Sequence, residues 1–134
     1  MTTPLSGGLE IASGETLVRQ FFAAVDAWDM PGLLRTMTAD VHFRFGNAQP
    51  TVGHEGVGES IAFLTPAVKS LSHDLLQIWT LDTPAPAVVC QLDVTYERHD
   101  GSEITLPAVD VFRLRDGLVA DCRIYIDTTP LFAA

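Results

Sequence analysis

The chain has 134 residues, which is the size of a single domain. Hydrophobic residues make up 47% of it, so it can bury a core and is not disordered as a whole. Its formal net charge of −9 argues against nucleic acid or an anionic membrane surface as a partner, because both bind clustered Lys and Arg. We therefore expect one globular domain that binds neither.

Residues 1–10 are rich in Thr, Pro, Ser and Gly and predict a flexible tail, followed by one domain over residues 11–134. The tail lacks the basic and apolar regions of a secretion signal, and no apolar run approaches the ~18 residues that span a bilayer. Cys90 and Cys122 lack the spacing of a zinc site and are expected to be buried free thiols. We expect a cytoplasmic protein with no metal and no organic cofactor, since there is also no Gly-rich phosphate loop.

Three helices are predicted in the first half of the chain. The first opens at Ser13 and carries apolar residues at helical spacing. The second is short, with Asp29 as its N-cap and Pro31 in its first turn. The third runs from residue 54 to about residue 71 and bends near Pro66.

Strands dominate the second half. Alternating apolar residues predict one strand over residues 41–45, before the third helix. Four more strands follow that helix, over residues 75–81, 87–98, 103–114 and 118–127, joined by turns into a meander. Helices gathered ahead of an antiparallel sheet indicate the α+β class rather than alternating α/β.

One carboxylate stands out within the last two strands. Side chains alternate along a strand, so five residues of the first of these strands share one face: Leu106, Ala108, Asp110, Phe112 and Leu114. Only Asp110 among them is polar. Burying it ionised and unpaired would cost several kcal/mol, so it should be protonated, hydrogen-bonded or part of a functional site.

The turn at residues 115–117 determines which residues Asp110 meets. A three-residue turn with glycine in the left-handed position would place Asp110 beside Cys122 and near Ile124. A two-residue turn would place it opposite Arg123 and would expose the apolar face of one strand. We therefore expect the three-residue turn.

The preceding hairpin allows two registers. A two-residue turn at Asp100 and Gly101 would bring to the face of Asp110 the side chains of Gln91, Asp93 and Thr95. A three-residue turn would bring instead Cys90, Leu92, Val94 and Tyr96. Hydrophobic matching favours the second register. The first is favoured if the sheet has two apolar sides, one lining a pocket and one covered by another subunit.

The order of these elements resembles the nuclear transport factor 2-like superfamily, especially its SnoaL-type polyketide cyclase and ketosteroid isomerase branches. The stretches that carry the resemblance are VRQFFAAVDAWDMPGLLRTMTADVHF and PAVDVFRLRDGLVADCRIYID. The resemblance covers about residues 15–131 and implies a cone-shaped roll. In such a roll, three N-terminal helices pack on a curved, mostly antiparallel sheet that encloses a pocket.

The resemblance also implies an activity and an assembly. The activity is acid/base chemistry on a hydrophobic carbonyl compound: isomerisation, cyclisation or dehydration. The assembly is a homodimer formed through the outer face of the sheet, which is expected to carry Val109, Val111, Val119, Arg123 and Tyr125. The alternative is a non-catalytic ligand-binding or dimerisation module of the same fold.

Position by position, Asp110 matches the acid that stays protonated in ketosteroid isomerases and donates to the substrate oxyanion. The tyrosine and the second aspartate of those enzymes fall at Phe21 and Phe45, so authentic ketosteroid isomerase activity is not expected. Limonene epoxide hydrolases use an Arg-x-Asp pair and a final Asp. Of these three groups only one, at Asp93, is present here, so epoxide hydrolysis is not expected either.

Both alignments favour the register that places Asp93 and Thr95 in the pocket with Asp110. We therefore predict Asp110 and Asp93 as the catalytic pair, because two close carboxyl groups raise one pKa and provide an acid and a base. His73 is the histidine expected to reach the pocket. The residues expected to contact the substrate are Phe21, Phe43, Phe45, Phe63, His73, Trp79, Thr95, Ala108, Phe112, Cys122 and Ile124.

Overall fold

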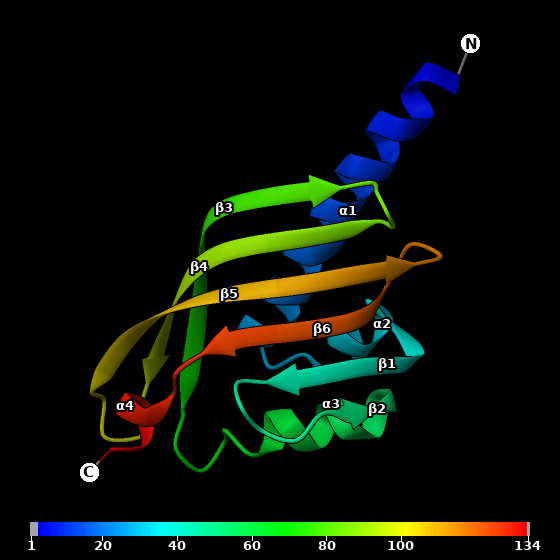
Figure 1. The fold of residues 1–134 in the computed structure, drawn as a ribbon. Coiled ribbons are helices and arrows are strands. Elements are labelled where there is room, and N and C mark those ends of the chain that lie inside the picture. The colour runs from blue at the N-terminus through cyan, green and yellow to red at the C-terminus, as the bar shows by residue number, and fades with distance from the viewer. Residues whose placement is uncertain (1–2, 134) are drawn as a thin grey trace.

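The computed structural model describes residues 3–133, with side chains described from residue 14 onward. Its elements in chain order are α1 (Thr3–Asp26), α2 (Met30–Arg35), β1 (Met37–Phe45), β2 (Thr51–Val52), α3 (Gly53–Ala62), β3 (Ser70–Leu81), β4 (Ala87–Glu97), β5 (Glu103–Arg115), β6 (Leu118–Ile126) and α4 (Thr129–Phe132). Helix α1 runs behind a curved sheet in Figure 1, with α2 and α3 beside its lower half. This arrangement confirms the predicted α+β roll.

The strands form one sheet in the order β2-β1-β6-β5-β4-β3. Strands β3 to β6 are the predicted antiparallel meander, and β1 joins its far edge parallel to β6. Strands β3 and β4 bend sharply (Figure 1), so the edge of the sheet curls toward the helices. The curled sheet has a concave inner face, which α1 covers.

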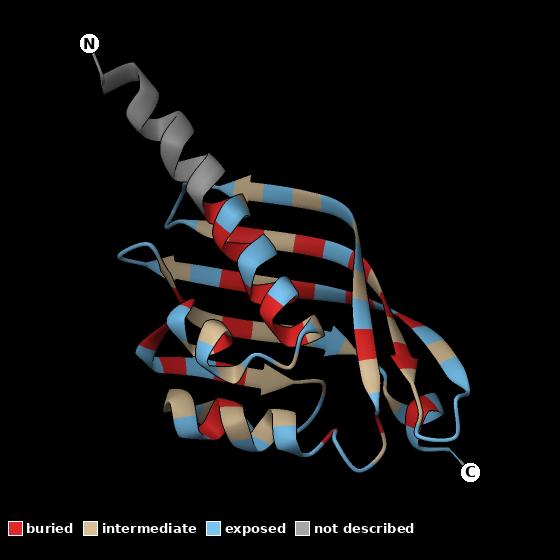
Figure 2. Ribbon diagram, turned by 180° about the vertical axis from the view of Figure 1, so that it is seen from behind, coloured by how far each residue is buried: buried red, intermediate tan, exposed pale blue. Residues whose placement is uncertain are grey.

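Three aromatic rings hold α1 on the middle of the sheet. Phe21 and Phe22 of α1 each meet Phe112 of β5 edge to face, at centroid distances of 5.0 and 5.7 Å. Figure 2 shows buried residues on the side of α1 that faces the sheet. Each such pair contributes roughly 0.5–1.5 kcal/mol beyond the apolar area that it buries.

The short helix forms as predicted. Asp29 is the N-cap of α2, and its Oδ1 accepts a hydrogen bond from the backbone N–H of Gly32 at 3.0 Å. Pro31 stands in the first turn, where its missing N–H costs nothing. Leu33 then faces the core and is 1% exposed.

Some elements differ from the prediction in their limits or their type. Helix α3 ends at Ala62, and turns lead to β3 at Ser70, because Pro66 cannot continue a helix. The predicted loop after β1 contains the short strand β2. Helix α1 begins at Thr3 rather than Ser13. Met1 and Thr2 of the predicted tail lie outside the described residues, and the flexibility of residues 1–10 stays a prediction.

The aromatic contact between α1 and β5 predicts a large effect of Phe112→Ala. Phe112 is fully buried, so we expect a loss of about 3–5 kcal/mol in the free energy of unfolding. Chemical denaturation followed by circular dichroism measures it. The matched control is Phe132→Ala, whose side chain is 46% exposed and whose loss should be about 1 kcal/mol or less. Equal losses in the two variants would contradict the assigned core.

Candidate functional site

Asp110 lies at the middle of β5, opposite Cys90 of β4 and Ile124 of β6. It is only 2% exposed, and its Oδ1 has no hydrogen-bond partner among the described residues. Burial raises its pKa to about 8, because ionisation would place a charge in an apolar environment. At neutral pH the carboxyl group is therefore mainly protonated and can donate a hydrogen bond.

Asp110 lines a narrow cavity of about 30 Å³ between α1, α3 and the inner face of the sheet. Its described lining is apolar apart from His73, Tyr96 and Asp110. Cavities that hold drug-sized ligands measure roughly 300–1,000 Å³. In this conformation the cavity therefore accommodates water or a small polar group, and a larger ligand requires the lining side chains to move.

His73 reaches this cavity from the curled part of β3, and Asp26 at the end of α1 holds it. The ring Nδ1 lies 2.5 Å from Oδ1 of Asp26, and the backbone N–H of His73 donates to Oδ2 at 3.2 Å. The ring also packs on Phe22 at a centroid distance of 4.8 Å. An imidazole that donates its Nδ1–H to a carboxylate keeps a lone pair on Nε2, so His73 is equipped to act as a base.

The expectation that Asp93 and Thr95 share the pocket with Asp110 is wrong. The hairpin between β4 and β5 has the three-residue turn 99–101, closed by a hydrogen bond of 2.8 Å from Arg98 N to Ser102 O. Gly101 takes a φ of 87°, which glycine adopts without strain. In this register Asp93 pairs with Pro107 and points to the outer face, as does Thr95. Hydrophobic matching, which favoured this register, outweighs the two alignments.

The hairpin between β5 and β6 gives the predicted face by a different route. The turn has two residues, Asp116 and Gly117, with φ of 55° and 76°. A bulge in β6 then shifts the register by one residue, so that Asp110 meets Ile124 rather than Arg123. The predicted three-residue turn is therefore wrong, whereas the predicted face of Asp110 is correct. The same bulge turns Val119 into the core, where it is fully buried, and not outward as expected.

The predicted contact residues fall into three groups. Those that line the cavity are Phe21, Phe43, Phe45, His73 and Ile124. Those that are buried in the surrounding core are Ala108, Phe112 and Cys122. Phe63 and Trp79 are wrong as lining residues, because their side chains are 66% and 47% exposed. Both cysteines are buried free thiols, as predicted.

Two polar residues of the site, Tyr96 and Asp26, were missed by the sequence analysis. Tyr96 is 1% exposed and lines the cavity, and the open register of its hairpin was the signal that could have placed it there. Asp26 ends an apolar helix and meets His73 across 47 positions of sequence. A lone acidic residue at a helix end carries no sequence signal for such a contact.

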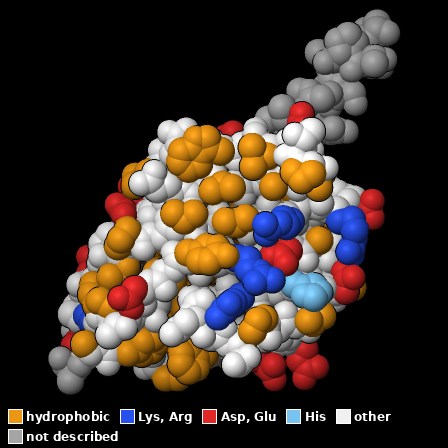
Figure 3. Space-filling model, in the orientation of Figure 1, with side chains coloured by type: hydrophobic (Ala, Val, Ile, Leu, Met, Phe, Trp, Pro, Cys, Tyr) orange, Lys and Arg blue, Asp and Glu red, His pale blue; other side chains and the backbone are white. Residues whose placement is uncertain are grey.

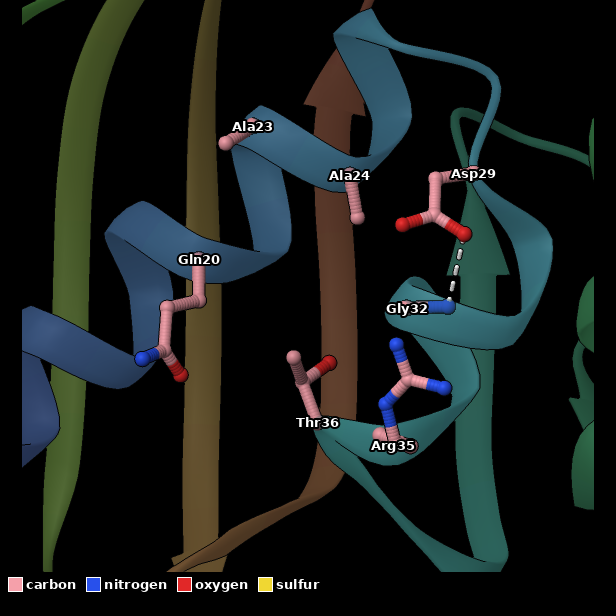
Figure 4. Close-up of a pocket in the computed structure, with 7 residues that line it drawn as sticks. All are labelled: Gln20, Ala23, Ala24, Asp29, Gly32, Arg35 and Thr36. Atoms are coloured by element: carbon pink, nitrogen blue, oxygen red, sulfur yellow. Dashed lines mark hydrogen bonds between the residues drawn. The ribbon is translucent and has the colours of Figure 1, made fainter.

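A second hollow, of about 420 Å³, lies open on the surface between α1 and α2 (Figure 4). Its polar side chains include Gln20, Asp29 and Arg35, all exposed to solvent. Asp29 already caps α2 there. The smaller cavity is the better candidate, because it alone combines a buried acid with an oriented histidine.

Two searches of the described residues found nothing. No three His, Cys, Asp or Glu side chains among them are grouped so as to hold a metal ion. Within residues 3–133, no helix combines the length and the apolar character needed to span a bilayer.

Comparison with known proteins agrees with this fold. The model of the SnoaL-like domain family matches residues 18–122. An NTF2-like protein of unknown function from Burkholderia pseudomallei superposes with a TM-score of 0.79 at 18% identity, over 89% of this chain and 94% of that one. A protein from Jannaschia assigned as a SnoaL-like polyketide cyclase gives 0.76 at 20% identity, over 90% and 89%.

A third structure, an epoxide hydrolase from M. tuberculosis of the limonene epoxide hydrolase type, gives a TM-score of 0.75 at 15% identity, over 92% of this chain and 89% of that one. Identities this low show that the fold is shared. They do not establish a shared activity. A search of curated proteins found no match.

The raised pKa of Asp110 predicts how stability depends on pH. The pKa rises on folding from about 3.8 to about 8, so the folded state binds the proton more tightly. This contribution to stability is complete below about pH 4 and is lost as the pH rises toward 8. Asp110→Asn cannot titrate. Its free energy of unfolding should therefore improve relative to wild type by roughly 2–4 kcal/mol between about pH 5 and pH 8.

Denaturation of both proteins across that pH range tests this dependence. Other groups titrate in both proteins and cancel in the difference. A constant difference across the range would show that Asp110 titrates like a solvated carboxyl group.

Proposed function

We propose that this chain, which belongs to the SnoaL-like domain family, is an acid/base enzyme acting on a small hydrophobic carbonyl compound. One observation carries the proposal: an imidazole oriented by a carboxylate and a neutral, buried carboxylic acid line the same apolar cavity. A base and an acid with opposed protonation states are what proton transfer at neutral pH requires.

The roles follow from the protonation states. Nε2 of His73 takes a proton from the carbon next to a carbonyl group, and Asp26 stabilises the imidazolium that forms. Protonated Asp110 donates a hydrogen bond to the carbonyl oxygen, where negative charge develops. The product of this step is an enol or enolate. Returning the proton to another carbon gives isomerisation, and loss of a neighbouring hydroxyl group gives dehydration.

Proton abstraction can be tested before the substrate is known. A panel of small cyclic and aromatic ketones is incubated with the protein in D₂O, and loss of the α-proton signal is followed by NMR. Wild type should accelerate exchange for at least one ketone. His73→Gln and Asp110→Asn should slow that exchange by about 10²–10⁴-fold, which is the usual contribution of general acid–base catalysis.

The matched control is His42→Gln. His42 is an exposed histidine on β1 and should leave the exchange rate unchanged. Exchange that proceeds equally in wild type and His73→Gln would contradict the proposed base. Exchange that no tested ketone undergoes with wild type would contradict the reaction class.

The small cavity favours a second candidate, a non-catalytic module of the same fold. About 30 Å³ is little room for a substrate, and side chains fill most of the space between α1 and the sheet. Under this alternative, Asp110 only positions a polar group of a ligand. Ketones would then bind without α-proton exchange, and Asp110→Asn would retain their affinity.

We also propose that two copies of the chain pair through the outer face of the sheet. Large apolar side chains on this face are exposed, including Trp79, Leu81, Val109 and Tyr125. Figure 3 shows that hydrophobic side chains are spread widely over this face. The charged side chains on the same face are unevenly distributed over the strands. Apolar area of this kind favours association.

The distribution of charge indicates a second copy as the occupant of this face. Arg113 and Arg123 share one carboxylate, Asp121, at 3.9 and 3.2 Å, which leaves a net positive group on β5 and β6. Asp74 and Asp93 pair with each other near the middle of β3 and β4, on the other half of the sheet. A two-fold axis across the strands sets the arginines of each copy over the two aspartates of the other.

The proposed dimer predicts that Val109→Glu yields a monomer. The substitution places a charge in the middle of the apolar face, where it would be buried without a partner. Light scattering after size-exclusion chromatography measures the mass. The control is Ala62→Glu at the exposed last residue of α3, which should stay dimeric. A monomeric wild type would contradict the proposal.

A further inference from the structure

The short helix α4 touches segments that form one end of the Asp110 cavity. Phe132 of α4 meets Phe63, the residue after α3, with ring centroids 5.8 Å apart. Leu64, the next residue, lines the cavity, and so does Ile126, the last residue of β6. Helix α4 therefore joins the cavity-lining segments that follow α3 and end β6.

An arginine holds α4 in this position. Arg98 directly follows β4, and its guanidinium group donates to Leu131 O at 3.3 and 3.4 Å and to Pro130 O at 3.1 Å. Of the four residues of α4, only Leu131 is buried. Segments with few buried contacts open locally at a much lower free energy than the core. We therefore expect α4 to detach while the sheet stays folded.

The cavity must open somewhere to take up a ligand, because it measures only about 30 Å³. Moving α1 or α3 would expose side chains that are fully buried, such as Val18 and Val57. Moving α4 would expose one leucine and would separate two aromatic rings that already meet solvent, since Phe63 and Phe132 are 66% and 46% exposed. Of these three helices, α4 moves with the least loss of buried apolar area.

We propose that α4 is a gate over the cavity and that Arg98 holds this gate closed. When the guanidinium group releases its two carbonyl groups, Phe132 separates from Phe63 and leaves an apolar entrance. A hydrophobic compound then reaches Asp110 through this entrance. The gate rests on the cavity being a ligand site, which both candidate functions share, and it does not depend on proton transfer.

Thiol labelling of a cysteine placed in the cavity tests the gate without any ligand. Val94 lines the cavity and is 3% exposed, and cysteine is close to valine in size, so Val94→Cys is the host for all measurements. Iodoacetamide alkylates accessible thiols, and tandem mass spectrometry follows each cysteine separately. The native Cys90 and Cys122 are fully buried outside the cavity lining, so they report unfolding of the domain in the same sample.

Arg98→Gln in this host should raise the labelling rate of the introduced thiol about tenfold or more, because α4 loses hydrogen bonds from a charged donor. Phe132→Ala should also raise the rate, because it removes the aromatic contact of the gate. Cys90 and Cys122 should stay slow in both variants. The matched control is Ser102→Ala, which removes another partner of Arg98, at 3.3 Å, and leaves the bonds to α4 in place.

Two results would overturn the gate. The first is an introduced thiol that reacts no faster than Cys90 and Cys122, because only unfolding of the domain would then open the cavity. The second is a labelling rate that neither Arg98→Gln nor Phe132→Ala raises above that of Ser102→Ala. An absence of ketone exchange, by contrast, would remove the proposed function and leave the gate in place.

Hydrogen exchange of wild type keeps the gate testable if Val94→Cys does not fold. The backbone N–H of Leu131 donates to Thr128 O at 2.9 Å within the α4 segment. Exchange of this amide at a much lower free energy than the amides of β5 supports local opening of α4. Equal protection of the two would overturn the gate, because α4 would then open only with the whole domain.

Discussion

The packing of α1 against β5 is the contact on which the site depends. Phe21 and Phe22 press on Phe112, and Asp110 lies two residues away on the same face of β5. The contact that builds the core therefore also shields the carboxyl group from bulk water and raises its pKa. Stability and the chemistry of the acid have one origin, because neither exists without α1 on the concave face.

Curvature of the sheet supplies the other groups. His73, Tyr96 and Asp110 lie on three different strands. In a flat sheet they would also be far from one another along the strand direction. Strands β3 and β4 are bent (Figure 1), and the three side chains line one cavity. Asp26 then fixes the ring of His73 at the point where α1 ends. The polar end of the cavity is thus assembled from α1, β3, β4 and β5.

Local rules explain what could be predicted from the sequence. The alternation of side chains along a strand predicted that Asp110 lies on the buried face. The N-cap residue Asp29 and Pro31 predicted where α2 begins. The orientation of Asp93 could not be settled locally, because one residue more in a turn reverses a whole strand. The bulge in β6 is marked by no distinctive residue, so the sequence does not predict it. The observed turn is one residue shorter than predicted, and the bulge compensates for this, so that Asp110 still lies on the predicted face. The contact between Asp26 and His73 depends on the curvature, which no local pattern specifies.

The energetics of Asp110 favour a site over a structural role. A structural acid would be expected to find a backbone N–H or a hydroxyl group, yet Oδ1 has no partner among the described residues. An apolar side chain that fits that place would pack without this penalty. A fold this small has a free energy of unfolding of only about 5–15 kcal/mol. The cost of an unsatisfied carboxyl group is therefore a considerable fraction of that free energy. Such a cost is understandable where the missing partner is a water molecule or the oxygen of a ligand, because binding then supplies the hydrogen bond that folding left unmade.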